Sequence, residues 1–293
     1  MILVVGGTGR LGSRLTGELV RRGASVRVMA RGESQPFPRK NVDGVELVRG
    51  TLASGKDCGR AVAGCSQVVF AASGFGLKRG GNPRSVDRDG ALRVIDAASR
   101  AGVEHVVMMS MHGAAPDAPL DFLRMKYAAE EALKASGMAW TVIRMGANLE
   151  QFLDSMSQPL HTKGRVLVFG SGRAPVTFTS TPDAAAAVRL ALFSPFLRGR
   201  IVEWGSETHP FNTLAEAILE DAGKGSIQRI PVAALRMMAA VAGPVSPFMA
   251  RMARAALWME SGAAAFDPAV ERAAFPEIPV IGLRESLDRI RST

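Results

Sequence analysis

The 293-residue sequence predicts an α/β protein in which a doubly wound parallel sheet is joined to a smaller C-terminal α/β lobe. Short runs of β-branched residues alternate with amphipathic helical patterns, which is typical of parallel sheets covered by helices. A glycine-rich turn links the first such run to the first helical pattern. The length fits a first domain, expected over 1–146, and a C-terminal lobe over 147–293 that is interwoven with it.

Six strands and three helices are expected in the first domain. Right-handed crossovers bring the carboxyl ends of parallel strands to one edge of a sheet. We therefore expect a ligand to contact the residues that directly follow each strand. The strands are predicted at 2–5, 25–29, 45–48, 67–71, 105–109 and 140–143, and the helices at 11–22, 86–100 and 120–135.

The motif GGTGRLG at 6–12 follows the first expected strand directly. Gly6, Gly9 and Gly12 allow a buried strand to turn into a helix while the backbone stays close to a pyrophosphate. Amide groups at the start of the helix can then bind phosphate oxygens. This strand, loop and helix context favours a nucleotide site over the alternative, a tight turn without a ligand.

The end of the second strand distinguishes the two nicotinamide cofactors. A site for NAD has Asp or Glu about 20 residues beyond the glycine loop, where the carboxylate binds the ribose hydroxyls. Here residues 19–32 contain no acid, and Arg31 ends the strand. A guanidinium can bind a 2′-phosphate in a bidentate manner, and Arg10 could approach the same phosphate. The pattern favours NADP(H), the alternative being that Arg31 is an ordinary exposed charge.

The C-terminal lobe has a looser pattern. A helix is expected to begin at Thr181-Pro182-Asp183, where Thr181 supplies a capping hydroxyl, Pro182 fits the first turn and Asp183 favours a helix N-terminus. Strands are predicted at 166–169, 176–178 and 201–204.

The stretch 232–258 is rich in Ala and Met but is interrupted before it reaches the roughly 20 apolar residues that a membrane span needs. We expect two short amphipathic helices that cover a substrate pocket, a partner subunit or a membrane surface, or that simply pack on the core. The interrupting residues are Arg236, Gly243, Pro244, Pro247, Arg251 and Arg254.

The net charge is +9, from 36 basic and 27 acidic residues. The basic residues are scattered, and one Tyr and three Trp offer little stacking surface, so nucleic acid is not expected as a partner. Cys58, in an expected helix, and Cys65, in the turn after it, form no metal-binding pattern, so we expect neither a metal nor a disulfide. Met1 lies one residue before the first strand, which predicts no secretory signal and a cytoplasmic location.

Four segments together resemble the atypical short-chain dehydrogenase/reductase proteins, specifically the NmrA-like NAD(P)-binding group. They occur in the family's order over nearly the whole chain, and the resemblance implies a Rossmann fold. The segments are GGTGRLG at 6–12, VDRDGALRVIDAASRAGVEHVVMMS at 86–110, KYAAEEALKASGMAWTVIRMG at 126–146 and FTSTPDAAAAV at 178–188.

The resemblance also implies which residues contact the cofactor. The pyrophosphate would be enclosed by Gly6, Thr8, Gly9, Arg10, Leu11 and Gly12. The adenosine 2′ position would be met by Arg31, and the adenine by Thr51 and Leu52, although many relatives have Asp in place of Thr51. The ribose on the nicotinamide side would be approached by Ala71, Ala72 and Ser73, and the nicotinamide ribose would be faced by Lys126.

The sequence departs from the family of short-chain dehydrogenases at one position. Those proteins have a tyrosine four residues before the lysine, and the charge of the lysine lowers the pKa of the phenol. Here that position is Phe122, which cannot exchange a proton. Tyr127 is adjacent to Lys126 and would point about 100° around the helix, so we expect it to be a packing residue.

A proton needed for reduction must therefore come from another group. The candidates are Ser110 and His112, after the fifth strand, and Lys126, either directly or by ordering a water. We expect an NADPH-dependent oxidoreductase that reduces a small apolar carbonyl, enone or quinone-like compound as a monomer or homodimer. The alternative is a non-catalytic NADP(H)-binding redox sensor, favoured by Phe122; sugar-nucleotide epimerisation is disfavoured because it generally uses the absent tyrosine.

Overall fold

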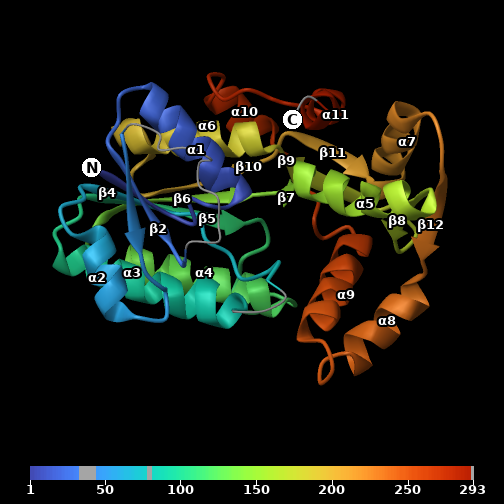
Figure 1. Cartoon of the computed structure of the whole chain (residues 1–293), viewed down its shortest axis with the longest axis horizontal. Helices are drawn as coiled ribbons and strands as arrows, with labels where there is room; N and C mark the ends of the chain where they lie inside the picture. The colour runs from blue at the N-terminus through green and yellow to red at the C-terminus, as the bar shows by residue number, and fades with distance from the viewer. Residues whose placement is uncertain (33–43, 78–80, 292–293) are drawn as a thin grey trace. The chain divides into compact units, whose positions relative to one another are not determined.

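The computed structural model describes residues 1–32, 44–77 and 81–291 (Figure 1). The chain forms two compact units, one of Met1–Arg144 with Ala184–Val202 and the other of Met145–Asp183 with Glu203–Thr293. Residues 184–202 thus return to the first unit, although the sequence-based division places them in the C-terminal lobe. Their return is explained by β10 (Arg200–Trp204), which pairs at the edge of the first unit's sheet beside β6.

The first unit contains a seven-stranded sheet in the order β10-β6-β5-β4-β1-β2-β3. The β1–β2, β2–β3, β1–β4 and β4–β5 ladders are all parallel. The direction of strand addition reverses between β1 and β4, which defines a topological switch point. The expected doubly wound α/β sheet is confirmed. Its other strands are β1 (Ile2–Val5), β2 (Val26–Ala30), β3 (Val45–Arg49), β4 (Gln67–Phe70), β5 (His105–Met111) and β6 (Ala139–Met145).

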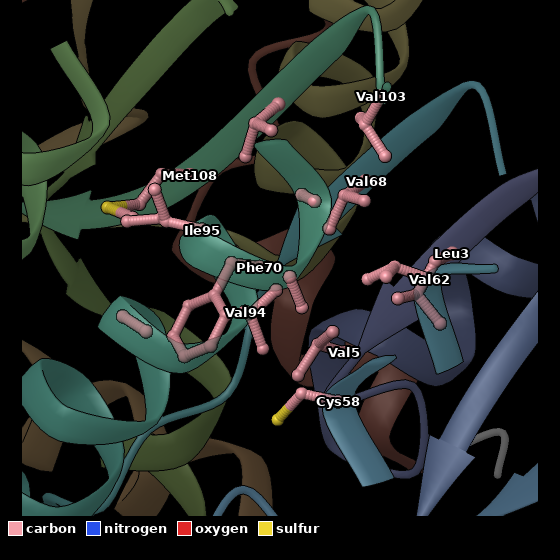
Figure 2. Packing of buried hydrophobic residues seen from close by; sticks show 14 of the residues in the cluster. Leu3, Val5, Cys58, Val62, Val68, Phe70, Val94, Ile95, Val103 and Met108 are labelled. Atoms are coloured by element: carbon pink, nitrogen blue, oxygen red, sulfur yellow. The ribbon is translucent and has the colours of Figure 1, made fainter. Parts of the chain in front are cut away.

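Helices cover both faces of this sheet, with α2, α3 and α4 on one face and α1 and α6 on the other (Figure 1). Figure 2 shows the core beneath the first group, where Val5 of β1 lies near Phe70 of β4 and Cys58 of α2. Leu3 of β1 lies beside Val62 of α2 in the same core. Burial raises the pKa of the Cys58 thiol and of the Cys65 thiol. The helices are α1 (Arg10–Arg21), α2 (Gly55–Val62), α3 (Asp89–Arg100), α4 (Asp121–Lys134) and α6 (Thr181–Phe193).

The second unit contains a three-stranded sheet, β11-β9-β7, and a two-stranded sheet, β12-β8. The sequence pattern located β8 (Arg165–Phe169) and β9 (Pro175–Thr179) but not β7 (Ala147–Asn148), β11 (Glu207–Pro210) or β12 (Ser226–Ile230). The last two are polar along most of their length, so they lack the apolar pattern on which the prediction depends. The helices are α5 (Leu149–Lys163), α7 (Phe211–Ala222), α8 (Val232–Val241), α9 (Pro247–Glu260), α10 (Ala269–Ala274) and α11 (Leu283–Arg291).

The start of α6 differs from the prediction by one residue. The capping hydroxyl belongs to Ser180, whose Oγ accepts a hydrogen bond from the Asp183 amide at 3.1 Å. The predicted cap, Thr181, instead donates from Oγ1 to Glu150 Oε2 at 2.8 Å. The buried Glu150 carboxylate requires hydrogen-bond donors, and the Thr181 hydroxyl is one of them. Thr181 therefore does not act as the cap.

The expectation of two short helices within 232–258 is confirmed by α8 and α9. Within the described ranges, the length and hydropathy of every helix fall short of what a bilayer-spanning helix requires.

Candidate cofactor site

The glycine loop lies at the topological switch point of the sheet. Gly6 follows β1 with φ +88°, and a Cβ at this position would lie 2.7 Å from the amide nitrogen of Ala72 and 2.8 Å from the carbonyl carbon of Ala71. The loops after β1 and β4 are therefore in direct contact, as expected for two strands that pair side by side. Ligands of open α/β sheets bind at this place, outside the carboxyl ends of the strands.

A second close approach joins the loop to α1. A Cβ on Gly12 would lie only 2.2 Å from the carbonyl oxygen of Gly6, so any side chain there would displace the backbone. The amide of Gly9 donates to the same oxygen at 2.9 Å, and Ser13 Oγ donates to the carbonyl of Gly7 at 3.0 Å. These contacts fix the loop tightly against the first turn of the helix.

The N-terminus of α1 has the chemistry of an anion site. Its cap is Gly9, which has no side chain that could accept hydrogen bonds from the first amides, and its first turn contains no acid. Exposed amides and the positive end of the helix dipole together favour a phosphate at this position. The residues present therefore fit a pyrophosphate.

The remaining residues implied by the resemblance lie after the neighbouring strands. Arg31 directly follows β2 and is exposed, as is Arg10 at the start of α1. Thr51 follows β3, where its amide donates to Asp57 Oδ2 at 3.0 Å. Ser73 follows β4, and its Oγ accepts from the amide of Phe75 at 3.2 Å. These groups all lie along the carboxyl edge of the first unit's sheet.

Lys126 is buried on α4 and forms an ion pair with Asp87. Its Nζ lies 3.0 Å from Asp87 Oδ1 and donates to the carbonyl of Met109, on β5, at 2.9 Å. Asp87 is fully buried in the π-helical segment Arg84–Arg88, and its Oδ2 accepts from the amide of Gly74 at 2.8 Å. Asp87 therefore connects Lys126 to the loop after β4.

A second buried carboxylate lies one turn further along α4. Glu130 is fully buried, and its Oε1 accepts a hydrogen bond from the hydroxyl of Ser110. Arg144, on β6, donates from Nη2 to Glu130 Oε2 at 2.6 Å and from Nε to Oε1 at 3.1 Å. The charge of Glu130 is thus compensated by a guanidinium, and the hydroxyl proton of Ser110 points toward a carboxylate.

Phe122 occupies the position of the missing tyrosine and is buried. Its ring centroid lies 4.8 Å from that of Phe75 and 5.7 Å from Lys126 Nζ. The aromatic ring one helical turn from Lys126 therefore lacks the hydroxyl group that a tyrosine would place there. Tyr127 is half-buried on the same helix, and His112 is half-buried in the turn after β5.

Two buried acids near Lys126 and Ser110 were not anticipated from the sequence. Asp87 pairs with Lys126, and Glu130 pairs with Arg144, a residue expected at the ligand-binding edge because it directly follows the sixth predicted strand. A periodicity argument would pair Lys126 with Glu130 because they are four residues apart on one helix. An acid on an otherwise apolar helix face indicates a buried carboxylate that needs a partner. This pattern could have pointed to Asp87 and Glu130, although it does not identify their partners.

Known proteins with similar sequences support a nucleotide site. A family model described as NAD(P)H-binding matches residues 6–166, more than half of the chain. An NAD(P)H azoreductase of Xenophilus azovorans is 31% identical over 67% of this chain and 64% of its own length. A (4-alkanoyl-5-oxo-2,5-dihydrofuran-3-yl)methyl phosphate reductase of Streptomyces griseus is 32% identical over 68% of this chain and 66% of its own. The matches thus span slightly less than two thirds of these relatives.

The fold is shared with solved structures over almost the full chain. A quinone oxidoreductase from Escherichia coli, complexed with NADPH, aligns with a TM-score of 0.78 and 20% identity, covering 99% of this chain and 100% of its own. The family match, the glycine loop and the strand order agree with the resemblance stated from the sequence. The chain belongs to the NAD(P)H-binding family, among the atypical short-chain dehydrogenase/reductase proteins of the NmrA-like group.

Proposed function

We propose that the protein is an NADPH-dependent oxidoreductase that reduces a small apolar enone, quinone-like or carbonyl compound. The observation that carries this proposal is the glycine cradle at the switch point, where Gly6 and Gly12 leave no room for a side chain. The named activities of the relatives, an azoreductase, a dihydrofuran phosphate reductase and a quinone oxidoreductase, support a reductase. When bound, NADPH would supply the hydride.

The chain itself would hold and orient the nucleotide. Gly6, Gly9 and Gly12 with the amides of α1 would bind the pyrophosphate, and Arg31 would bind the 2′-phosphate. Lys126 uses two of its three N–H donors on Asp87 and Met109. We assign its remaining donor to a hydroxyl of the nicotinamide ribose, so that Asp87 acts as the positioning residue for Lys126.

The nature of the proton source favours particular substrates. Phe122 cannot donate a proton, and the Ser110 hydroxyl already donates to Glu130. His112 and Lys126 are the remaining candidates among the predicted residues. A simple ketone gives a strongly basic alkoxide and needs a positioned proton donor, whereas a quinone gives a phenolate whose pKa of about 10 resembles that of tyrosine. An acceptor that yields a stabilised anion can take its proton from water, so we place quinones and enones above simple ketones.

The proposal is tested by following NADPH absorbance against a panel of quinones, enones and aliphatic ketones. We expect turnover of quinones or enones and much slower turnover of ketones. Turnover of none of them by protein that binds NADPH would contradict the proposal. Lys126→Ala is a second probe, because a variant that binds NADPH and keeps full turnover would exclude a direct role for Lys126.

Cofactor preference has its own test. Replacing Arg31 with Ala removes a charge-assisted contact and should weaken NADPH binding by about 10- to 100-fold, with little effect on NADH. Arg22→Ala, at the opposite end of α1, is the matched control and should change neither affinity. Equal affinity of the unmodified protein for the two nucleotides would contradict the assignment of Arg31.

A second candidate function is a non-catalytic NADP(H)-binding redox sensor. It is favoured by Phe122, because a sensor needs the nucleotide but no proton donor. A sensor should bind a partner with different affinities in the presence of NADP⁺ and NADPH and should reduce no panel member. Turnover of any quinone or enone would exclude it.

A further inference from the structure

The helical hairpin formed by α8 and α9, in the second unit, has an unusual charge composition (Figure 1). Between Asp221 and Glu260 the chain contains no acidic residue. The same segment contains five basic residues, which are Lys224, Arg229, Arg236, Arg251 and Arg254. Any surface that this segment presents is therefore positively charged.

Only some of the apolar side chains of α8 and α9 are buried in the contact between the two helices. Leu235 of α8 packs with Ala253 and Ala256 of α9, and Met238, Ala239 and Leu257 are half-buried against them. Arg254 reinforces the hairpin by donating from Nη2 to the carbonyl of Ala239 at 3.1 Å. The contact between the helices thus uses one side of α8.

The other side of α8 and the turn after it expose large apolar side chains. Met237 is 62% exposed, Val241 65%, Val245 90% and Met249 45%. We call these four residues the hairpin tip. Met237 and Val241 are one helical turn apart, Val245 lies in the connection between the helices, and Met249 lies in the first turn of α9. Large apolar side chains are rarely exposed together on a surface that contacts only water. Such exposure is typical of an interaction site.

Arginines lie close in sequence to the hairpin tip on both helices. Arg236 precedes Met237 and is exposed, and the Arg251 guanidinium lies 5.7 Å from the ring of Phe248. A second copy of the chain, docked tip to tip, would bring like charges together without a carboxylate from either segment. An anionic surface satisfies the arginines while an apolar layer accepts the methionines and valines.

We propose that the hairpin tip binds the surface of an anionic phospholipid bilayer. Met237, Val241, Val245 and Met249 enter the boundary between headgroups and acyl chains, and Arg236, Arg251 and Arg254 face the lipid phosphates. The helices lie on the bilayer and do not cross it, because α8 has 10 residues and α9 has 14. The inference is independent of the proposed function, since none of its residues belongs to the first unit.

The test is flotation of the full-length protein with vesicles of phosphatidylcholine alone or with added phosphatidylglycerol. We expect association only with the anionic vesicles, weakening as salt is added. Val245→Glu should lower the partition coefficient by at least about 10-fold, because it removes buried apolar surface and adds repulsion. Arg236→Gln should lower it by about 5-fold.

Val270→Glu is the matched control, because Val270 is 76% exposed on α10 of the same unit. It should float like the unmodified protein. A second measurement uses Val245→Cys carrying an environment-sensitive fluorophore, since the native Cys58 and Cys65 are buried and will not be labelled. Its emission should shift to the blue with anionic vesicles and not with phosphatidylcholine alone.

Three results would overturn the proposal. One is the absence of flotation with phosphatidylglycerol at low salt. Another is flotation of the Val245→Glu variant equal to that of the Val270→Glu control. The third is self-association in sedimentation equilibrium that Val245→Glu abolishes while vesicle binding is unchanged, which would identify a second copy of the chain as the occupant.

Discussion

Buried carboxylates are held differently in the two units. In the first unit, Asp87 and Glu130 are fully buried and each meets a cation, Lys126 or Arg144. In the second unit, Asp183 is equally buried but accepts its hydrogen bonds from neutral donors. Ser206 Oγ donates to Asp183 Oδ2 at 2.5 Å, and the Ile281 amide donates to both oxygens at 3.1–3.2 Å.

The two units therefore differ in the kind of group that compensates a buried carboxylate. A cation replaces most of the hydration that a carboxylate loses, whereas hydroxyls and amides replace less, so burial raises the pKa of Asp183 to about 6. Asp87 forms an ion pair with Lys126, and Glu130 accepts a hydrogen bond from Ser110, which lies near the carboxyl end of β5. The neutral network joins the start of α6 to the residues before α11. We propose that the ion-paired acids position the cofactor site, whereas Asp183 connects chain segments.

The largest effect is expected from breaking one ion pair. Asp87→Asn leaves the Lys126 ammonium buried without a counter-charge and should cost about 3–5 kcal/mol of unfolding free energy. Denaturant unfolding measures this value. Because a buried pair contributes little net stability, Asp87→Asn with Lys126→Met should recover most of the loss. A double variant as unstable as the single one would show that the two residues are not coupled.

A smaller effect is expected at Asp183, where burial favours the protonated, neutral form of the acid. Its pKa in the folded state, about 6, lies above the unfolded value of 3.8. The second unit should therefore lose stability as the pH rises from about 4 to about 6, by up to about 3 kcal/mol. The charge of Glu150 also raises the pKa of Asp183 and so strengthens this trend. Amide hydrogen exchange in α11 measures the trend, and Asp183→Asn should remove it.

The first unit should respond to pH in the other direction through His105. Burial, aided by Arg198, lowers the pKa of His105 to about 4 from 6.5, and its Nε2 lies 3.0 Å from Thr141 Oγ1. The contribution of neutral His105 to the unfolding free energy should be complete above pH 6.5. It should fall by up to about 3 kcal/mol as the pH drops from 6.5 to about 4. His105→Gln should flatten this profile. Profiles of the same sign in both units would refute the comparison.

The smallest effect concerns the neutral donors of the second unit. Ser180→Ala removes the cap of α6 and should cost about 1 kcal/mol. Thr181→Ala should leave the cap intact while removing one donor to Glu150. If Thr181→Ala alone destabilised the helix start, the assignment of the cap to Ser180 would be wrong.

The sequence predicted the sheet and the glycine loop because both depend on local patterns. The six strands of the first domain are short apolar runs. Gly6 precedes a clear amphipathic helix, and Gly12 lies in the first turn of that helix. The ion pairs were not predictable, because Asp87 and Lys126 are far apart in the chain and meet only through tertiary packing. Likewise β11 and β12 are strands through pairing with β9 and β8, not through their own apolar residues.

The central claim is that the glycine cradle of the first unit binds the nucleotide, and a matched pair of variants tests it directly. Gly12→Ala places a methyl group 2.2 Å from the carbonyl oxygen of Gly6, whereas Gly17→Ala, on the same helix, meets only the flexible Arg21 side chain at 3.4 Å. Titration with NADPH should show at least about 10-fold weaker binding for Gly12→Ala and unchanged binding for Gly17→Ala. Equal affinities in the two variants would contradict the claim.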